Sequence, residues 1–330
     1  MSTPKCVASP AFDFVRRVRF SVCGACLVGA AMLAGTTAWA ESGTPSQFSI
    51  EVGTSYEDQS SPLIRISPQG ELLYLGGLQR LGASSMRIGL QGFANWQMDN
   101  GSGLSLAVDV SAKRSPALPD FNFGTASIQP AWHVPLGSGT VGAGLTLQQI
   151  TVAGQSFRVV SNAQVDWTHL DMDQGLWSLV IELGTNRHPV ELAELNASTA
   201  SVVVQRRWSQ PLPWIDSIDL SAHTSIEHND QGFSELSHRS VLISAGMQRR
   251  WRDVLWSTGL SLQRIQFDAT AFVEDPVRLD RLVTFDIAVE LDVTPRHSVR
   301  VEYSEAINTS TLALYDNRYQ RFAIKWRTSW

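Results

Sequence analysis

Cysteine is missing from most of this 330-residue chain, because Cys6, Cys23 and Cys26 all lie within its first 26 residues. The remaining chain therefore cannot use the disulfide bonds that stabilise many small secreted domains. Beyond residue 40 the sequence also lacks an uninterrupted apolar run of the ~20 residues that a membrane-spanning helix needs. Residues 121–157 contain no Asp, Glu, Lys or Arg, but prolines and glycines interrupt them. A disulfide-rich domain and a bundle of membrane helices are both disfavoured.

Positive charge is also scarce, since 26 Lys and Arg residues face 31 Asp and Glu residues. Residues 1–40 hold four of the basic residues and one of the acidic ones, so the chain after them has 22 basic against 30 acidic residues and a net charge of −8. An acidic chain of this kind gives no reason to expect nucleic acid as a partner.

Residues 1–40 have the features of a secretion signal. Arg16, Arg17 and Arg19 form a basic region, residues 20–35 are apolar and uncharged, and Ala-Trp-Ala precedes Glu41 as a cleavage site. The alternative is a membrane anchor, but the apolar region is shorter than a spanning helix. We therefore expect a cleaved signal peptide at 1–40 and a short periplasmic segment at 41–47.

In the rest of the sequence, apolar and polar residues alternate. From Asp216 to Asn229, one side takes Ile218, Leu220, Ala222, Thr224 and Ile226, and the other takes Asp219, Ser221, His223, Ser225 and Glu227. The pattern recurs at 48–57, 104–111, 141–148, 177–184 and 283–292. It predicts an all-β protein whose strands have one apolar and one polar face.

A soluble sandwich and a transmembrane barrel both satisfy this alternation. The alternating segments run over about 10 to 14 residues, longer than the ~5–6 of common soluble strands and close to the ~9–11 that cross a bilayer when tilted. Short turns, among them residues 209–217, alternate with generally longer loops, with the short turn at 153–155 as an exception on the rim of the long loops. This is the outer-membrane pattern, in which the short turns lie in the periplasm. We therefore predict an antiparallel, up-and-down transmembrane β-barrel over residues 48–330.

The alternation of turns and loops also predicts the strand number. Fourteen strands place both termini on the periplasmic side, as an even number requires. The segment Leu72–Leu81 is either part of the first external loop or an extension of the second strand, and a barrel of sixteen strands is the fallback.

Tryptophan is abundant, and most of it falls near the short-turn ends of the expected strands. The residues concerned are Trp96, Trp132, Trp167, Trp177, Trp208, Trp251, Trp256, Trp326 and Trp330. Aromatic girdles form where a barrel meets the headgroups of the membrane. This placement predicts a girdle rather than a soluble core.

An apolar exterior implies a polar lumen, and the alternation identifies its lining. The predicted lumen residues are Arg87, Asp109, Arg158, Asp166, Glu182, Arg207, Asp219, Arg250, Asp286, Glu290, Arg300, Glu302, Arg321, Lys325 and Arg327. The charges near the carboxyl terminus either neutralise one another as a cross-strand ladder or create a field that selects solutes.

Catalysis has one candidate group. His223 and Ser225 share a face, with Glu227 next on that face and Glu235 in the following loop, as a lipid hydrolase would need. These residues are expected to face the lumen rather than the lipid, so we predict no enzyme. The seven histidines are dispersed and no cysteine accompanies them, so no metal or other cofactor is predicted.

The chain ends on alternating apolar residues: Phe322, Ile324, Trp326 and finally Trp330. A terminal aromatic residue after such a pattern resembles the signal by which the barrel assembly machinery receives its substrates. We expect these four residues to form that signal, and we expect the finished barrel to contact outer-membrane lipids and lipopolysaccharide.

Two stretches resemble a known family. Asn308-Thr309-Ser310, Leu314-Tyr315-Asp316, Arg318 and Arg321, before the terminal strand, together with residues 52–60, are similar to the barrel domain of surface lipoprotein assembly modifiers of Gram-negative bacteria. The resemblance implies a barrel that moves a lipoprotein cargo. The helical repeat domain of those proteins is not expected here, because residues 42–47 alone separate the signal from the first strand.

The sequence therefore predicts an integral protein of the bacterial outer membrane that acts as a passive channel or export pore. The alternatives are a barrel that assembles or translocates surface lipoproteins and a lipid hydrolase of the outer membrane. A lipoprotein or a polysaccharide is the expected cargo if the barrel exports.

Overall fold

The computed structural model describes residues 46–66, 72–117, 119, 122–171, 175–270 and 276–330. These residues form fourteen strands and two short 3₁₀ helices. The strands are β1 (Ser46–Ile66), β2 (Leu72–Gln97), β3 (Gly103–Arg114), β4 (Phe123–Leu136), β5 (Gly139–Val152), β6 (Gln155–Leu170), β7 (Gly175–Arg187), β8 (Ala197–Leu212), β9 (Ile215–Asn229), β10 (His238–Trp251), β11 (Val254–Phe267), β12 (Leu279–Thr294), β13 (His297–Ser310) and β14 (Asn317–Ser329), and the helices are η3 (Val190–Leu195) and η4 (Ala313–Tyr315).

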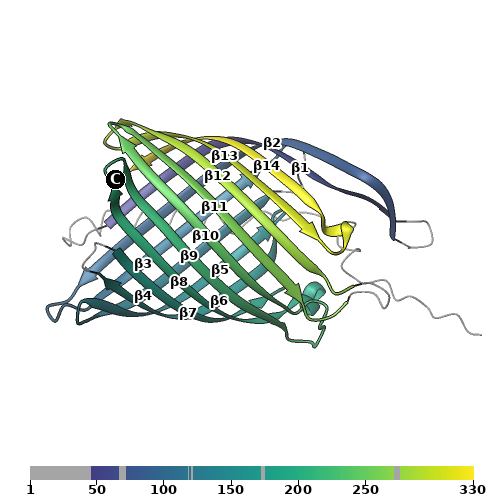
Figure 1. The fold of residues 1–330 in the computed structure, drawn as a ribbon, viewed down its shortest axis with the longest axis horizontal. Helices are drawn as coiled ribbons and strands as arrows, with labels where there is room; N and C mark the ends of the chain where they lie inside the picture. The colour runs from purple at the N-terminus through teal and green to yellow at the C-terminus, as the bar shows by residue number, and fades with distance from the viewer. Residues whose placement is uncertain (1–45, 67–71, 118, 120–121, 172–174, 271–275) are drawn as a thin grey trace, which may run out of the picture.

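Every strand pairs antiparallel with its neighbours in the sequence, and β1 also pairs with β14, so the sheet closes into a barrel (Figure 1). The closing pair runs from Ser49 opposite Ser329 to Ser60 opposite Arg318. Closure leaves the wall without an exposed edge strand. The predicted all-β, up-and-down barrel of fourteen strands is confirmed, and the fallback of sixteen is wrong.

Residues 72–81 form the first part of β2 rather than a strand of their own. They pair with β1, as far as Ile66 opposite Leu72, whereas β3 first meets β2 at Met86. Figure 1 shows the β1–β2 hairpin extending past the ends of the neighbouring strands. Of the two roles predicted for this segment, the strand extension is confirmed.

The two rims of the barrel differ. One rim carries short connections, such as Pro213-Trp214 between β8 and β9, where the sequence predicted a turn of nine residues. Strand β8 continues through a bulge at Gln210, whose φ of +51° bends the chain without ending the pairing. The other rim carries longer loops, with the tight Ala153-Gly154 turn as the expected exception.

Both ends of the described chain lie at the rim with the short turns. The amide of Trp330 donates to the carbonyl of Phe48 at 2.9 Å, and the amide of Phe48 donates to the carbonyl of Trp330 at 3.2 Å. Figure 1 marks the carboxyl terminus at this rim. The predicted periplasmic location of the termini stays a prediction.

The outer face of the wall is apolar and exposed, as the period of two requires. On β12, for example, Val283, Phe285 and Leu291 are 40%, 40% and 46% exposed. Toward the short-turn rim the exposed side chains become tryptophans, including Trp132 and Trp256 at 49% and 48%. No helix among the described residues is long and apolar enough to cross a membrane.

Arg206 is a basic side chain that lies within this tryptophan belt. The guanidinium of Arg206 stacks 4.7 Å from the ring centre of Trp177 and 4.6 Å from that of Trp208. It also reaches Asp171 at 3.4 Å. The faces of the two rings attract the guanidinium electrostatically, which allows this charge to lie among the aromatic side chains of the belt.

Candidate functional site: the inner wall

The inner face of the barrel is polar. Its side chains occupy the positions between the exposed apolar ones, and all the residues predicted to line a lumen fall on this face: Arg87, Asp109, Arg158, Asp166, Glu182, Arg207, Asp219, Arg250, Asp286, Glu290, Arg300, Glu302, Arg321, Lys325 and Arg327. The structure joins some of them into one ion-pair network and leaves others apart. Their part in conduction stays a prediction.

The network lies where the barrel closes, and Glu302 is at its centre. The carboxylate of Glu302 accepts hydrogen bonds from Arg300 Nε at 2.7 Å, Lys325 Nζ at 3.0 Å and Arg321 at 3.2 Å. These side chains come from β13 and β14. Because the residue is only 9% exposed, each cation replaces water that the carboxylate has lost.

Glu51 and Glu290 extend the network to either side. Glu51 lies 3.3 Å from both Lys325 and Arg327. Glu290 lies 3.2 Å from Arg300 and 3.5 Å from Arg327. Each carboxylate therefore contacts at least two cations, and most cations contact two carboxylates. The arrangement is the neutralising ladder that the sequence offered as one alternative.

A glycine makes this close packing feasible. Gly53 lies opposite Lys325 in the closing pair. A Cβ atom at Gly53 would stand 2.6 Å from the carbonyl oxygen of Ile324 and 2.9 Å from Cγ of Lys325. Only a residue without a side chain leaves room for the lysine stem here.

Glu57 also belongs to this region, although the sequence prediction did not include it. Its carboxylate pairs with Lys113 at 2.5 Å across β2. The alternation places Glu57 on the polar face of its strand, so the signal was present. Its partner could not be predicted, because Lys113 is on a strand that is not adjacent to β1.

Elsewhere the charges of the inner wall form isolated pairs. Arg207 pairs with Asp219 at 2.5 Å between neighbouring strands. Arg250 pairs with Asp292, which lies beyond the intervening strand β11. Asp109 accepts a hydrogen bond from Gln91 at 3.1 Å.

Serine and threonine hydroxyls fill the inner wall between these charges. Cross-strand hydroxyl pairs link Ser221 to Ser244 at 2.6 Å and Ser111 to Thr125 at 2.8 Å. Such pairs satisfy short polar side chains without projecting far from the wall.

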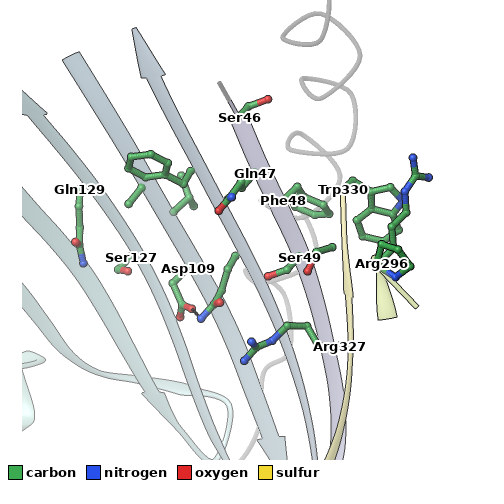
Figure 2. Close-up of a pocket in the computed structure, with 17 residues that line it drawn as sticks. Ser46, Gln47, Phe48, Ser49, Asp109, Ser127, Gln129, Arg296, Arg327 and Trp330 are labelled. Carbon is green, nitrogen blue, oxygen red and sulfur yellow. Dashed lines mark hydrogen bonds between the residues drawn. The ribbon is translucent and has the colours of Figure 1, made fainter. Parts of the chain in front are cut away.

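The inner wall beside the network borders empty space. A cavity of about 730 Å³ is lined by Gln91, Asp109, Ser127, Gln129 and Arg327, together with residues of the short-turn rim. In Figure 2, Asp109 lies between Gln129 and Arg327 along the wall that lines this space. A second cavity of about 430 Å³ adjoins it along β2 to β6 and shares Phe93 with it. The sequence prediction did not include Phe93, which is an apolar residue on the polar face.

The candidate hydrolase residues do not form a catalytic chain of hydrogen bonds. The Ser225 hydroxyl is paired with that of Ser240 at 2.7 Å, and Glu227 accepts from Asn186 at 2.9 Å. The Nε2 atom of His223 is buried and has no hydrogen-bond partner among the described residues. No group of three or more possible metal ligands occurs in the described part of the chain either.

Two long loops are fastened together by Asn229, which is only 1% exposed. Its amide nitrogen donates to the carbonyls of Glu194 at 2.6 Å and Asn196 at 3.2 Å. Its amide oxygen accepts from the backbone of Gln231 and Phe233 at 3.0 and 3.1 Å. One side chain thus fixes η3 and the β9–β10 loop against the same rim.

Two titratable groups in the loops of this rim have shifted pKa values. Burial, together with the charge of Arg158, lowers the pKa of His188. Burial opposes ionisation of Asp230, but hydrogen bonds from Ser198 and Arg187 outweigh it and lower the pKa of Asp230. At neutral pH the β7–β8 loop therefore holds a neutral His188, and the β9–β10 loop holds an ionised Asp230.

The barrel is similar to solved structures of outer-membrane proteins. OmpT of Vibrio cholerae aligns with a TM-score of 0.50 at 10% identity, over 87% of this chain and 98% of that one. The outer membrane protein opdK of Pseudomonas aeruginosa aligns with a TM-score of 0.46 at 9% identity, over 87% and 99%. An anion-selective porin of Comamonas acidovorans aligns with a TM-score of 0.43 at 11% identity, over 87% and 99%.

At these identities the likeness shows the fold alone, which is that of an outer-membrane-type β-barrel. No protein-family model and no curated protein sequence matches the chain. The resemblance to surface lipoprotein assembly modifiers stays a prediction.

Proposed function

We propose that this chain is a channel of the bacterial outer membrane, through which small hydrophilic solutes pass by diffusion. The observation that carries the proposal is the contrast between the two faces of one closed wall. The outer face is apolar and ends in a tryptophan belt, whereas the inner face is charged and encloses the cavity of about 730 Å³. A barrel with this polarity suits a bilayer outside and water inside.

The proposed orientation places the short-turn rim and both termini in the periplasm and the longer loops outside the cell. Short periplasmic turns and longer external loops are the rule in such barrels. The proposed route is secretion through the inner membrane with a signal peptide at 1–40, followed by insertion through the barrel assembly machinery.

The proposed pore has a weak preference for cations. On the inner face four acidic side chains make no ion pair with a described residue, against two basic ones: Asp109, Glu182, Glu227 and Asp286, against Arg87 and Arg158. The network around Glu302 contributes only one net positive charge, because it joins four cations to three carboxylates. A small excess of acidic groups attracts cations only modestly in a wet lumen.

Conductance of the refolded mature chain in planar bilayers tests the proposal. We expect discrete openings that persist at both signs of voltage. A protein that shows its heat-modifiable folded form in gels but gives no openings would refute the channel. A Ser225→Ala variant serves as a matched control, and we expect its conductance to be unchanged because the substitution removes an uncharged hydroxyl that is hydrogen-bonded to that of Ser240.

The same preparation separates the alternatives. Release of fatty acid from phospholipid or lipid A that is lost in Ser225→Ala would favour the hydrolase. Folded barrels without conductance whose deletion prevents display of a surface lipoprotein would favour lipoprotein assembly.

A further inference from the structure

Three neighbouring strands each carry an arginine on the apolar outer face near the long-loop rim: Arg239 on β10, Arg264 on β11 and Arg281 on β12. All three are exposed, and the side chain of Arg239 is 73% exposed. They share the face of the exposed apolar residues Val241, Leu262 and Val283, which follow them toward the middle of the barrel. We call these three residues the outer arginine patch.

The register brings the patch together. Arg264 lies directly opposite Arg281 across β11 and β12, and Arg239 lies opposite Gln266, two residues along from Arg264. Side chains directly opposite one another in an antiparallel pair have Cβ atoms about 5 Å apart, and like charges there repel. Two arginines at such a pair therefore favour a shared anion between them.

Protein groups do little to neutralise the patch. Asp268 stands 3.9 Å from Arg239, and no ion pair joins Arg264 or Arg281 to a described residue. Arg318 on the same face shows the contrast, since Glu305 neutralises it at 2.5 Å. The anion that the patch lacks must come from outside the described chain.

The position of the patch along the barrel axis indicates which surroundings supply that anion. On β12 the apolar outer residues run from Val293 to Val283, and Arg281 is the next outward-facing residue. Ten residues of a tilted strand span about 25 Å along the barrel axis, which is the height of the apolar band of such barrels. The patch therefore lies at the membrane surface opposite the tryptophan belt.

We propose that the outer arginine patch binds the phosphate groups of a phosphorylated glycolipid, lipid A, in the outer leaflet. The site rests on the proposed placement of the long-loop rim at the cell surface, but not on conduction. Guanidinium groups hold phosphate through paired, charge-assisted hydrogen bonds. The apolar residues directly below the patch, such as Leu262 and Val283, then lie beside the acyl chains of the same lipid.

Lipid binding to the full mature barrel in zwitterionic micelles tests the site, with native mass spectrometry as the readout. The probes are bisphosphorylated lipid A, dephosphorylated lipid A and phosphatidylglycerol, and inorganic phosphate serves as competitor. We expect the bisphosphorylated form to bind best. The double variant Arg264→Gln, Arg281→Gln should lose affinity by about tenfold for each arginine. Arg249→Gln, on the outer face near Trp256 at the other rim, is the matched control and should bind normally.

Thermal unfolding provides a second readout that simple structural damage would not mimic. Without lipid A the double variant should be as stable as the parent or more so, because it removes a repulsive pair. With lipid A only the parent and Arg249→Gln should gain stability.

Equal lipid A affinity of parent and double variant would overturn the site. Equal affinity for phosphatidylglycerol and lipid A would overturn its assignment to a glycolipid. Conductance of the double variant is expected to match the parent, so a barrel that conducts without selective lipid A binding refutes this site and leaves the channel intact.

Discussion

Replacing Glu302 with glutamine should shift the ion selectivity of the proposed pore toward anions. The substitution keeps the size of the side chain and removes the one negative charge that Arg300, Arg321 and Lys325 share. In water, the Coulomb energy between a unit charge and a permeating ion ~10 Å away is ~0.4 kcal/mol. Screening at 0.1 M salt, where the Debye length is ~10 Å, reduces this to ~0.15 kcal/mol.

Because the change favours anions and disfavours cations at once, the permeability ratio should shift by about 1.7-fold at 0.1 M salt. At 0.01 M the screening length is ~30 Å, and the shift should grow to about threefold. Reversal potentials under a salt gradient across a planar bilayer measure this ratio. An unchanged ratio at both salt concentrations would show that Glu302 does not face the conducting path.

Asp286→Asn is the matched control, because it removes one charge from the same face without breaking an ion pair that joins described residues. It should shift the selectivity by a similar amount. The two variants should differ in stability: Glu302→Gln leaves Arg321 without its carboxylate and should cost about 3 kcal/mol, whereas Asp286→Asn should cost less than about 0.5 kcal/mol. Equal denaturant midpoints in micelles would contradict the central place given to Glu302.

Three further outcomes are expected at the rims of the barrel. Asn229→Ala should destabilise the long-loop rim by about 3 kcal/mol, because it leaves buried backbone groups unpaired, and limited proteolysis should then cut near η3; a cleavage rate equal to that of the parent would contradict this. The loop around His188 should lose protection from amide hydrogen exchange as the pH falls below ~6.5, since the lowered pKa of His188 means that the unfolded loop binds the proton first; His188→Gln should abolish this pH dependence, and an unchanged profile would refute it. Deletion of Trp330 should reduce the amount of assembled barrel in membranes more than it alters the conductance of barrels that do form, because the residue pairs with Phe48 at the closing strand; heat-modifiable barrel at the parent level would count against the assembly role.

The sequence predicted the faces of the strands better than the contacts between them. A period of two assigns a residue such as Glu290 or Arg250 to the polar face, whatever the pairing. Contacts such as that between Arg250 and Asp292 depend on the stagger of three strands, and the alternation carries no information about stagger. The strand number follows from the alternation of short turns and longer loops. The β8–β9 turn is shorter than the sequence predicts, because Gln210 forms a bulge within a strand that continues beyond it.

The outer arginine patch was missed for a related reason. Arg264 follows an alternating apolar stretch and Arg281 precedes one, so each looks like an ordinary strand end. Their juxtaposition exists only once β11 and β12 are in register. A search for basic residues at the ends of apolar faces would have found each arginine separately but not the pair.

The closing pair of strands also determines when the inner wall can exist during biosynthesis. Glu51 and Arg327 are 276 positions apart, so the nascent chain displays the carboxylate long before the ribosome adds its partner. Contacts between residues this remote in sequence form slowly, and until β14 arrives β1 remains an unpaired edge that other chains or proteases can reach. A chain that lacks its last strand therefore leaves the sheet open and Glu51 without either of its two cations.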